Sequence, residues 1–193
     1  MSNYTSTPGL KPKDTSWHIE ERPLSTDISS IIAEVLAFDT EWYLDTSRQD
    51  NNLVHKDTKM FQLIYTPYLW QLGDQFIPAL VNTLKSPDLL DLYAEIENYY
   101  SGKIARCEII DMTGQADIPT HVDGMEFLTV ARRVHVPLYT HENVFFTVMN
   151  TTVNMKVGNW YEINNCLPHS VKNNGDQRRI HMILDVLAED YIK

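Results

Sequence analysis

Three histidines in this chain are each followed, two positions later, by an acidic residue, a spacing that suits metal binding. The pairs are His18 with Glu20, His55 with Asp57, and His121 with Asp123. Side chains two residues apart on a β-strand point to the same face, so both members of a pair can bind one ion. About one such pair is expected by chance at this content of acidic residues. The spacing alone therefore does not identify a site.

The residues downstream separate these pairs. His121 is followed by His169 in "CLPHSVKN" and then by Arg179 in "RRIHMILDV". Two histidines and one carboxylate are the ligand set of non-haem Fe(II) centres, which leave coordination positions open. A guanidinium that faces the same interior suits a bidentate contact with a carboxylate. We therefore predict a metal site of His121, Asp123 and His169 beside Arg179, and we expect His18 and His55, which lie in polar stretches, on the surface.

The segment "IPTHVDGMEFLTVARRVHVPL", residues 118–138, carries several charged groups in a run that otherwise resembles β-strand. Such groups are costly to bury without partners. Period-two alternation places Arg133 and His135 on one face and Arg132 on the opposite face. We expect Arg133 and His135 to point into a site, and Arg132 to lie on the surface.

The elements that must position these residues change character near residue 102. Residues 1–16 resemble a loose tail, and a loop containing "RQDNN" leads to a strand at about 60–65. Helices are predicted from about residue 27, with Ile28, Ile31, Ile32, Val35 and Leu36 on one stripe, and over 86–100, with Leu90, Tyr93, Ile96 and Tyr100 on another. The second half contains short β-branched and aromatic runs, which indicate a sandwich, barrel or jelly roll. These runs are 103–112, 127–138, 144–150, 152–158, 159–164, 169–173 and 178–187.

Length and composition predict a single domain, residues 1–193, with a helix-rich lead-in at 1–101 and a β-rich core at 102–193. The formal net charge of −10 argues against binding to nucleic acid or to an anionic membrane. The N-terminus shows no apolar signal sequence, and no apolar run is long enough to span a membrane. Two cysteines far apart in sequence, Cys107 and Cys166, are expected to be reduced thiols. Together these features favour a cytoplasmic protein.

The string "HVDG…RRVHVPLYT…VGNWYEINNCLPHSVKNNGDQRRIHMILDV" resembles the aspartyl/asparaginyl β-hydroxylase-like family of Fe(II)- and 2-oxoglutarate-dependent oxygenases. The resemblance implies a double-stranded β-helix core (jelly roll, cupin-like) flanked by N-terminal helices. It also implies iron bound by His121, Asp123 and His169. Arg179 would then bind the distal carboxylate of 2-oxoglutarate, and Arg133 and His135 would contact or orient the other end of the cosubstrate.

Two departures leave the substrate open. Animal-type aspartyl hydroxylases lack the iron carboxylate, whereas Asp123 is present here, as in bacterial members such as the cis-proline hydroxylases. Those members have a C-terminal extension, which this sequence does not show after Arg179. The expected substrate is a small molecule such as an amino acid, or an Asp/Asn side chain in a peptide. The alternative is a non-oxidative metal-binding cupin that binds small molecules or takes part in an assembly.

Several further residues keep two interpretations. His181 shares a face with Arg179 and either contacts the site or is an ordinary barrel histidine. Asn173 either fixes the tautomer of His169 or caps a turn, and His141 is expected in a turn rather than at the barrel mouth. Four aromatic residues are expected in the core and the barrel wall, namely Phe145, Phe146, Trp160 and Tyr161.

Overall fold

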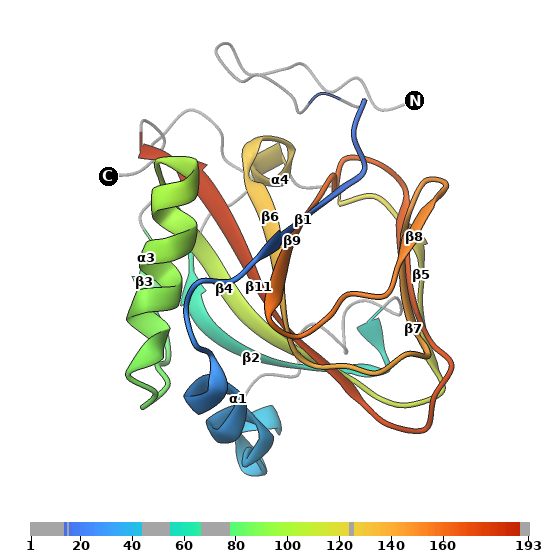
Figure 1. The fold of residues 1–193 in the computed structure, drawn as a ribbon, viewed down its shortest axis with the longest axis horizontal. Coiled ribbons are helices and arrows are strands. Elements are labelled where there is room, and N and C mark those ends of the chain that lie inside the picture. Colours follow the sequence, from blue (N-terminus) through green and yellow to red (C-terminus); the bar gives the residue numbers. More distant parts are fainter. Residues whose placement is uncertain (1–13, 15, 44–54, 67–77, 124–125, 190–193) are drawn as a thin grey trace.

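Two antiparallel β-sheets face each other, and helices cover the outer side of the larger one (Figure 1). The computed structural model describes residue 14 and residues 16–43, 55–66, 78–123 and 126–189. Most of the predicted tail and the loop at 48–54 lie outside these ranges. The sandwich is a jelly roll, which confirms the predicted fold class.

The large sheet runs, in spatial order, through β1 (Ile19–Pro23), β9 (Asn159–Ile163), β6 (Arg132–Tyr139), β11 (Arg179–Ala188), β4 (Gly102–Met112), β2 (Thr58–Tyr65) and β3 (Ala79–Leu80). The small sheet runs through β5 (Ala116–His121), β10 (His169–Asn173), β7 (Val144–Val148) and β8 (Thr151–Val153). The helical segments are α1 (Ser29–Leu36), the 3-10 turn η1 (Thr40–Tyr43), α3 (Asp88–Tyr100) and α4 (Glu126–Val130).

The two faces of the large sheet differ in chemistry, because side chains alternate along each strand. On β11, Ile180, Met182 and Leu184 belong to the main apolar core beneath α1 and α3. The intervening residues, including Arg179 and His181, point to the opposite face, toward the small sheet. A second apolar cluster fills part of the space between the sheets; its buried members are Met112, Ala116, Ile118, Val144, Phe146, Val148, Met155, Tyr161, Ile163 and Val171. The sandwich interior is therefore partly apolar and partly polar.

The sequence correctly predicts where the two helices lie, but it is wrong in part about which of their residues are buried. Helix α1 begins at Ser29, after the N-cap residue Ile28, and the backbone N–H of Ser29 donates to Oδ1 of Asp27 at 2.9 Å. Leu36, however, is largely exposed. In α3, the expected Leu90 is 73% exposed, and Leu92 is fully buried instead. The buried face of α3 is thus rotated from the predicted one.

The strand predictions hold for most segments, with corrections at four places. Residues 127–130 belong to the short helix α4, because one helical turn buries Phe127, Leu128 and Ala131 in a small cluster of their own. The run at 152–158 contributes only to β8, which ends at Val153. Phe145 is 37% exposed, whereas Phe146, its neighbour on the opposite face of β7, is buried. Strand β1 was missed because its charged sequence, "IEERP", forms an edge.

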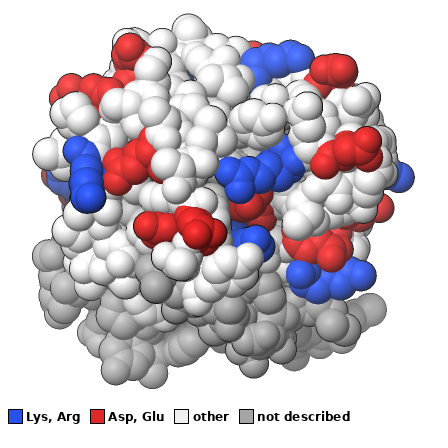
Figure 2. Space-filling model, turned by 90° about the horizontal axis from the view of Figure 1, so that it is seen from below, with Lys and Arg blue, Asp and Glu red and all other residues white. Residues whose placement is uncertain are grey.

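Charged side chains of both signs are interspersed on the face shown in Figure 2, and they form no continuous basic surface there. Among the described residues, no helix has both the length and the apolar character that crossing a bilayer requires. Cys107 and Cys166 carry thiols and form no disulfide.

Candidate metal centre

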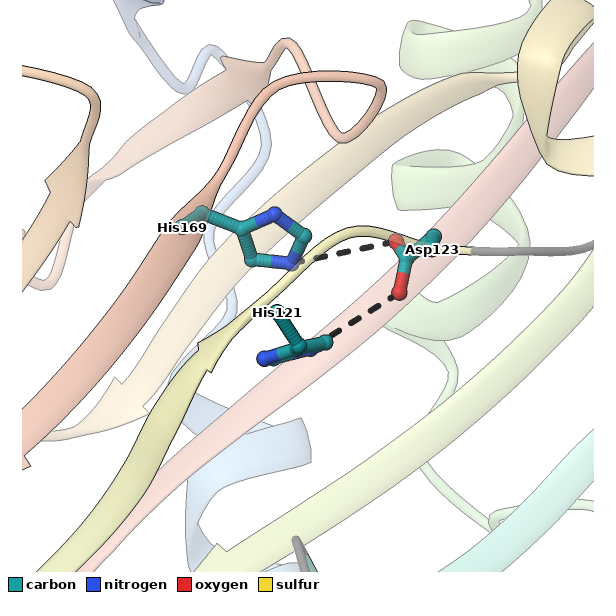
Figure 3. Close-up of side chains that lie close together, drawn as sticks. All are labelled: His121, Asp123 and His169. Carbon is teal, nitrogen blue, oxygen red and sulfur yellow. Dashed lines mark ion pairs between the residues drawn. The ribbon is translucent and has the colours of Figure 1, made fainter. Parts of the chain in front are cut away.

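Three side chains from the small sheet and the turn after it meet at one point (Figure 3). Nε2 of His121 lies 3.8 Å from Oδ1 of Asp123, and Nε2 of His169 lies 3.9 Å from Oδ2 of the same carboxylate. The ligand atoms of all three lie within 4.8 Å of one another. These distances are too long for hydrogen bonds. They are short enough for one ion to bind both atoms of each pair, because a metal–ligand bond is about 2.1 Å long.

Strand pairing brings the two histidines together. His121 ends β5 and His169 begins β10, and the two are Cα partners in the antiparallel register. The register shifts between His169 and Val171, an irregularity of the kind that re-aims side chains beside functional sites. The imidazole centroids lie 4.3 Å apart.

Backbone carbonyls fix the tautomers of both rings. Nδ1 of His121 lies 2.8 Å from the carbonyl oxygen of Pro119, and Nδ1 of His169 lies 2.9 Å from that of Leu167. Because a carbonyl only accepts, each Nδ1 must carry the proton. In the neutral form of each ring, the lone pair then lies on Nε2 and faces Asp123, which is the arrangement that metal-binding histidines require.

The third ligand is held from two sides. The backbone N–H of Asp123 donates to the carbonyl oxygen of Asn165 at 3.2 Å, which fixes the turn after β5. Nη1 of Arg133 donates to Oδ2 of Asp123 at 2.7 Å. Burial opposes ionisation, but Arg133, His169 and His121 together outweigh it, so the pKa of the Asp123 carboxyl lies below its usual value.

The donor set fits a divalent cation. Burial lowers the pKa of His169, which favours the neutral imidazole that a metal binds. Two neutral imidazoles and one carboxylate carry a single negative charge, and one Asp123 oxygen is already bound to Arg133. Two nitrogens and one oxygen on one side of an ion match the facial set of non-haem Fe(II) sites.

Arg133 belongs to a buried ionic network that sequence reasoning did not anticipate. Its Nε and Nη2 donate to the two oxygens of Asp185 at 2.9 and 3.1 Å, and Nε of Arg106 donates to the same carboxylate at 2.7 Å. In this structure Arg133 thus connects Asp123 to Asp185. Arg132 points the other way and is exposed, as predicted.

Three further polar side chains lie inside the sandwich on the large sheet. Arg179 is 1% exposed, His181 1% and His135 4%. Nη2 of Arg179 lies 2.5 Å from Nδ1 of His181, and the His181 and His135 ring centroids are 5.8 Å apart. Phe146 lies between this group and the candidate ligands: its ring centroid is 5.1 Å from that of His135 and 6.2 Å from that of His169.

Both interior histidines are held neutral. Burial, aided by Arg179 and Arg133, keeps the pKa of His135 well below its usual value. Burial, aided by Arg179 and His135, does the same for His181. Neither ring nitrogen of His135 has a hydrogen-bond partner among the described residues, and the same is true of Nε2 of His181. Buried polar atoms are normally paired, so these are the atoms where a polar ligand would be bound.

Asn173, the last residue of β10, binds the turns beside it, and His141 lies in the turn before β7. The Asn173 amide donates to the carbonyl oxygens of Thr113 and Gln177 at 3.0 and 2.8 Å. Since Leu167 fixes the His169 tautomer, Asn173 acts on the turn rather than on the site. His141 precedes β7, and its Nε2 lies 3.2 Å from the carbonyl oxygen of Gln177, in agreement with the turn prediction.

His18 and His55 correct the expectation of surface residues, since both are half-buried beside candidate ligands. The ring of His55 packs edge-on to that of His121, with centroids 6.1 Å apart. Nδ1 of His18 lies 2.7 Å from Oγ1 of Thr151. His18 and His169 both line a cavity of about 490 Å³, together with Thr120, Thr147, Met149, Asn150, Pro168 and Ser170. No local pattern predicts these positions, because long-range packing creates them.

Fold and ligand set together define a jelly-roll protein with a two-histidine, one-carboxylate centre. The model of the aspartyl/asparaginyl beta-hydroxylase family matches residues 29–189. The chain therefore belongs to this family, which confirms the predicted family and, with it, a hydroxylase of the 2-oxoglutarate-dependent oxygenase class.

Two solved structures share the fold over nearly their whole length. One is an oxidoreductase of the 2OG-Fe(II) oxygenase family from Burkholderia pseudomallei, with a TM-score of 0.53 and 14% identity, covering 89% of this chain and 95% of that one. The other is the viral collagen prolyl hydroxylase of Paramecium Bursaria Chlorella virus-1 in complex with 2OG, with a TM-score of 0.51 and 8% identity, covering 89% and 96%. Among curated proteins, no relative matches the chain.

Proposed function

We propose that this protein is an Fe(II)- and 2-oxoglutarate-dependent dioxygenase that hydroxylates a C–H bond of an amino acid or of an Asp/Asn side chain in a polypeptide, with release of succinate and CO2. The observation that carries the proposal is the pairing of two features in one sandwich. A two-histidine, one-carboxylate centre lies on the small sheet, and a buried guanidinium with two neutral imidazoles lies on the large sheet.

His121, Asp123 and His169 would hold the iron, because their ligand atoms face a common point and the Nδ1 atoms of the two histidines are bound to backbone carbonyls instead. Bound iron with 2-oxoglutarate and oxygen supplies the oxidant that replaces a substrate C–H with C–OH. The chain itself orients its ligands and shields them from water.

The interior of the large sheet suits the dianionic cosubstrate. Arg179 is buried beside His181, and its planar, permanently charged guanidinium suits a bidentate contact with a carboxylate. We assign it to the distal carboxylate. His135 lies between Arg179 and the iron ligands and has two ring nitrogens able to contact the 2-oxo acid end. Arg133 reaches this end through its contact with Asp123, the iron carboxylate.

The decisive experiment combines binding with turnover. We expect 2-oxoglutarate to bind only with a divalent metal, as measured by anaerobic calorimetry with Fe(II) or with Mn(II) in its place. Iron-dependent release of succinate should also occur, even without substrate. Both His121→Ala and His169→Ala should abolish it, whereas His141→Ala, a histidine in a turn away from the centre, should retain it. Full turnover in either ligand variant would refute the assignment, and metal binding without metal-dependent 2-oxoglutarate binding would favour a non-oxidative cupin.

The substrate is tested by competition between two classes. Free amino acids and short peptides containing Asp or Asn should be compared for their ability to raise succinate release above the uncoupled rate, with hydroxylated product identified by mass spectrometry. The cavity that His169 lines is bordered by neutral polar residues and Met149. A substrate that enters there should lose apparent affinity in Thr147→Val, while cosubstrate affinity is unchanged.

A further inference from the structure

His181 lies next to Arg179, and the geometry of this contact fixes the state of its ring. A guanidinium has only N–H groups and never accepts a hydrogen bond. In the 2.5 Å contact with Nη2 of Arg179, Nδ1 of His181 must therefore be the acceptor and carry no proton. The neutral ring then has its proton on Nε2. Burial and the charge of Arg179 lower the pKa of His181, in agreement with a neutral ring.

The resulting Nε2–H is a buried donor without a hydrogen-bond partner among the described residues. Its residue is 1% exposed. Leaving a buried donor unsatisfied is unfavourable, so a position of this kind calls for an acceptor. The donor is part of a ring in contact with Arg179, the guanidinium that we assign to an anionic group.

We propose that Nε2–H of His181 donates a hydrogen bond to the distal carboxylate of the cosubstrate, next to Arg179, and so selects a 2-oxo acid that has a second carboxylate. The inference rests on the proposed function and adds a residue to it. Arg179 has two effects here: it attracts the anion, and it holds His181 in the tautomer that donates. A neutral donor beside a fixed cation gives directional recognition of a carboxylate without a second buried charge.

The neighbouring groups fit this assignment. His135 approaches the same histidine from β6, with ring centroids 5.8 Å apart, and it too is held neutral. The next inward-pointing residue of β11 is apolar Ile183, which packs with Met60 and Ile110. On the interior face of β11, the polar residues Arg179 and His181 are thus followed by an apolar one. A carboxylate bound beside Arg179 and His181 would therefore be enclosed.

The test compares 2-oxoglutarate with 2-oxobutyrate, which has the same 2-oxo acid end but no distal carboxylate. Binding of each to the full chain is measured by anaerobic calorimetry with Mn(II). In His181→Leu we expect 2-oxoglutarate affinity to fall about 10- to 100-fold, the loss of one hydrogen bond to a charged group, while 2-oxobutyrate affinity changes less than about 2-fold. His181→Gln, which keeps a donor at a similar reach, should recover most of the difference, and His141→Leu is the matched control.

Three results would overturn the proposal. Equal losses for the two acids in His181→Leu would show that the ring does not contact the distal end. Unchanged 2-oxoglutarate affinity would make His181 a wall residue. Nitrogen NMR of the wild-type protein with labelled histidine provides a readout that needs no variant: an Nδ1–H tautomer for His181 would contradict the geometry. If the wild-type protein binds neither acid in the presence of metal, the proposed function itself fails. If the wild-type protein binds 2-oxoglutarate and the His181 variants bind it equally well, only this inference is refuted.

Discussion

Replacing Asp185 by asparagine tests the buried ionic network most directly. Asp185 is fully buried, and its two oxygens accept three hydrogen bonds of 2.7 to 3.1 Å from Arg106 and Arg133. Asparagine has nearly the same shape but no charge, and its amide group donates, so it opposes guanidinium donors. Removing one partner of a buried ion pair costs about 3–5 kcal/mol. We expect Asp185→Asn to lower the free energy of unfolding by this amount at pH 7.

The measurement is urea denaturation at equilibrium, with equal m-values for the two proteins. Asp111→Asn is the matched control, because Asp111 is also a buried carboxylate of the large sheet. Its contact with Arg178 is longer, 3.3 Å, and burial raises the pKa of its carboxyl. The control should therefore be neutral or slightly stabilising at pH 7. A loss below about 1 kcal/mol in Asp185→Asn, within the range of ordinary surface substitutions, would refute the reasoning.

The same pair of proteins predicts a pH dependence. Burial opposes ionisation of Asp185, but Arg106 and Arg133 outweigh it, and the pKa of the carboxyl lies below its usual value. The stabilisation it contributes is thus complete above the unfolded-state pKa of about 4 and is lost as pH falls below that value. The stability difference between the wild-type protein and Asp185→Asn should shrink between about pH 4 and pH 2. A difference that grows in acid would contradict the assigned sign.

Two other predictions concern packing and reactivity. Leu92→Ala should destabilise the protein by about 2–5 kcal/mol in the same urea assay because Leu92 is fully buried, whereas Leu90→Ala, at an exposed position, should have little effect. A larger loss in Leu90→Ala than in Leu92→Ala would mean that α3 docks by the stripe expected from the sequence. Burial raises the pKa of the Cys107 thiol to about 12. In the native protein at pH 8, a thiol reagent should therefore modify the half-buried Cys166 first, as measured by mass spectrometry. Rapid labelling of Cys107 would contradict its burial.

Alternation along single strands was the most informative signal in the sequence. It correctly separated Arg132 from Arg133 and placed His181 with Arg179, because a one-residue step changes the face. Continued by two residues past Ile183, the same alternation leads to Asp185, the acid that binds Arg133. That residue could thus be placed on the interior face from sequence, although its partner could not be identified.

The predictions that were wrong concern residues whose burial depends on packing between distant segments of the chain. On α3, Leu89 and Leu90 are equally apolar, and only the docking of the helix on the large sheet decides that Leu90 is exposed. His55 lies among polar residues, so local composition placed it on the surface. Its contact with His121 arises from the approach of two chain segments that no periodicity connects.

The candidate metal ligands all come from the small sheet and the turn after β5, whereas Arg179, His181 and His135 all come from the large sheet. Under the proposed function, substitutions at Arg179 or His181 would alter the choice of cosubstrate without changing a metal ligand or the Arg133–Asp123 contact. A lineage would thereby lose oxidative turnover yet remain a metalloprotein by changing only these two residues of β11.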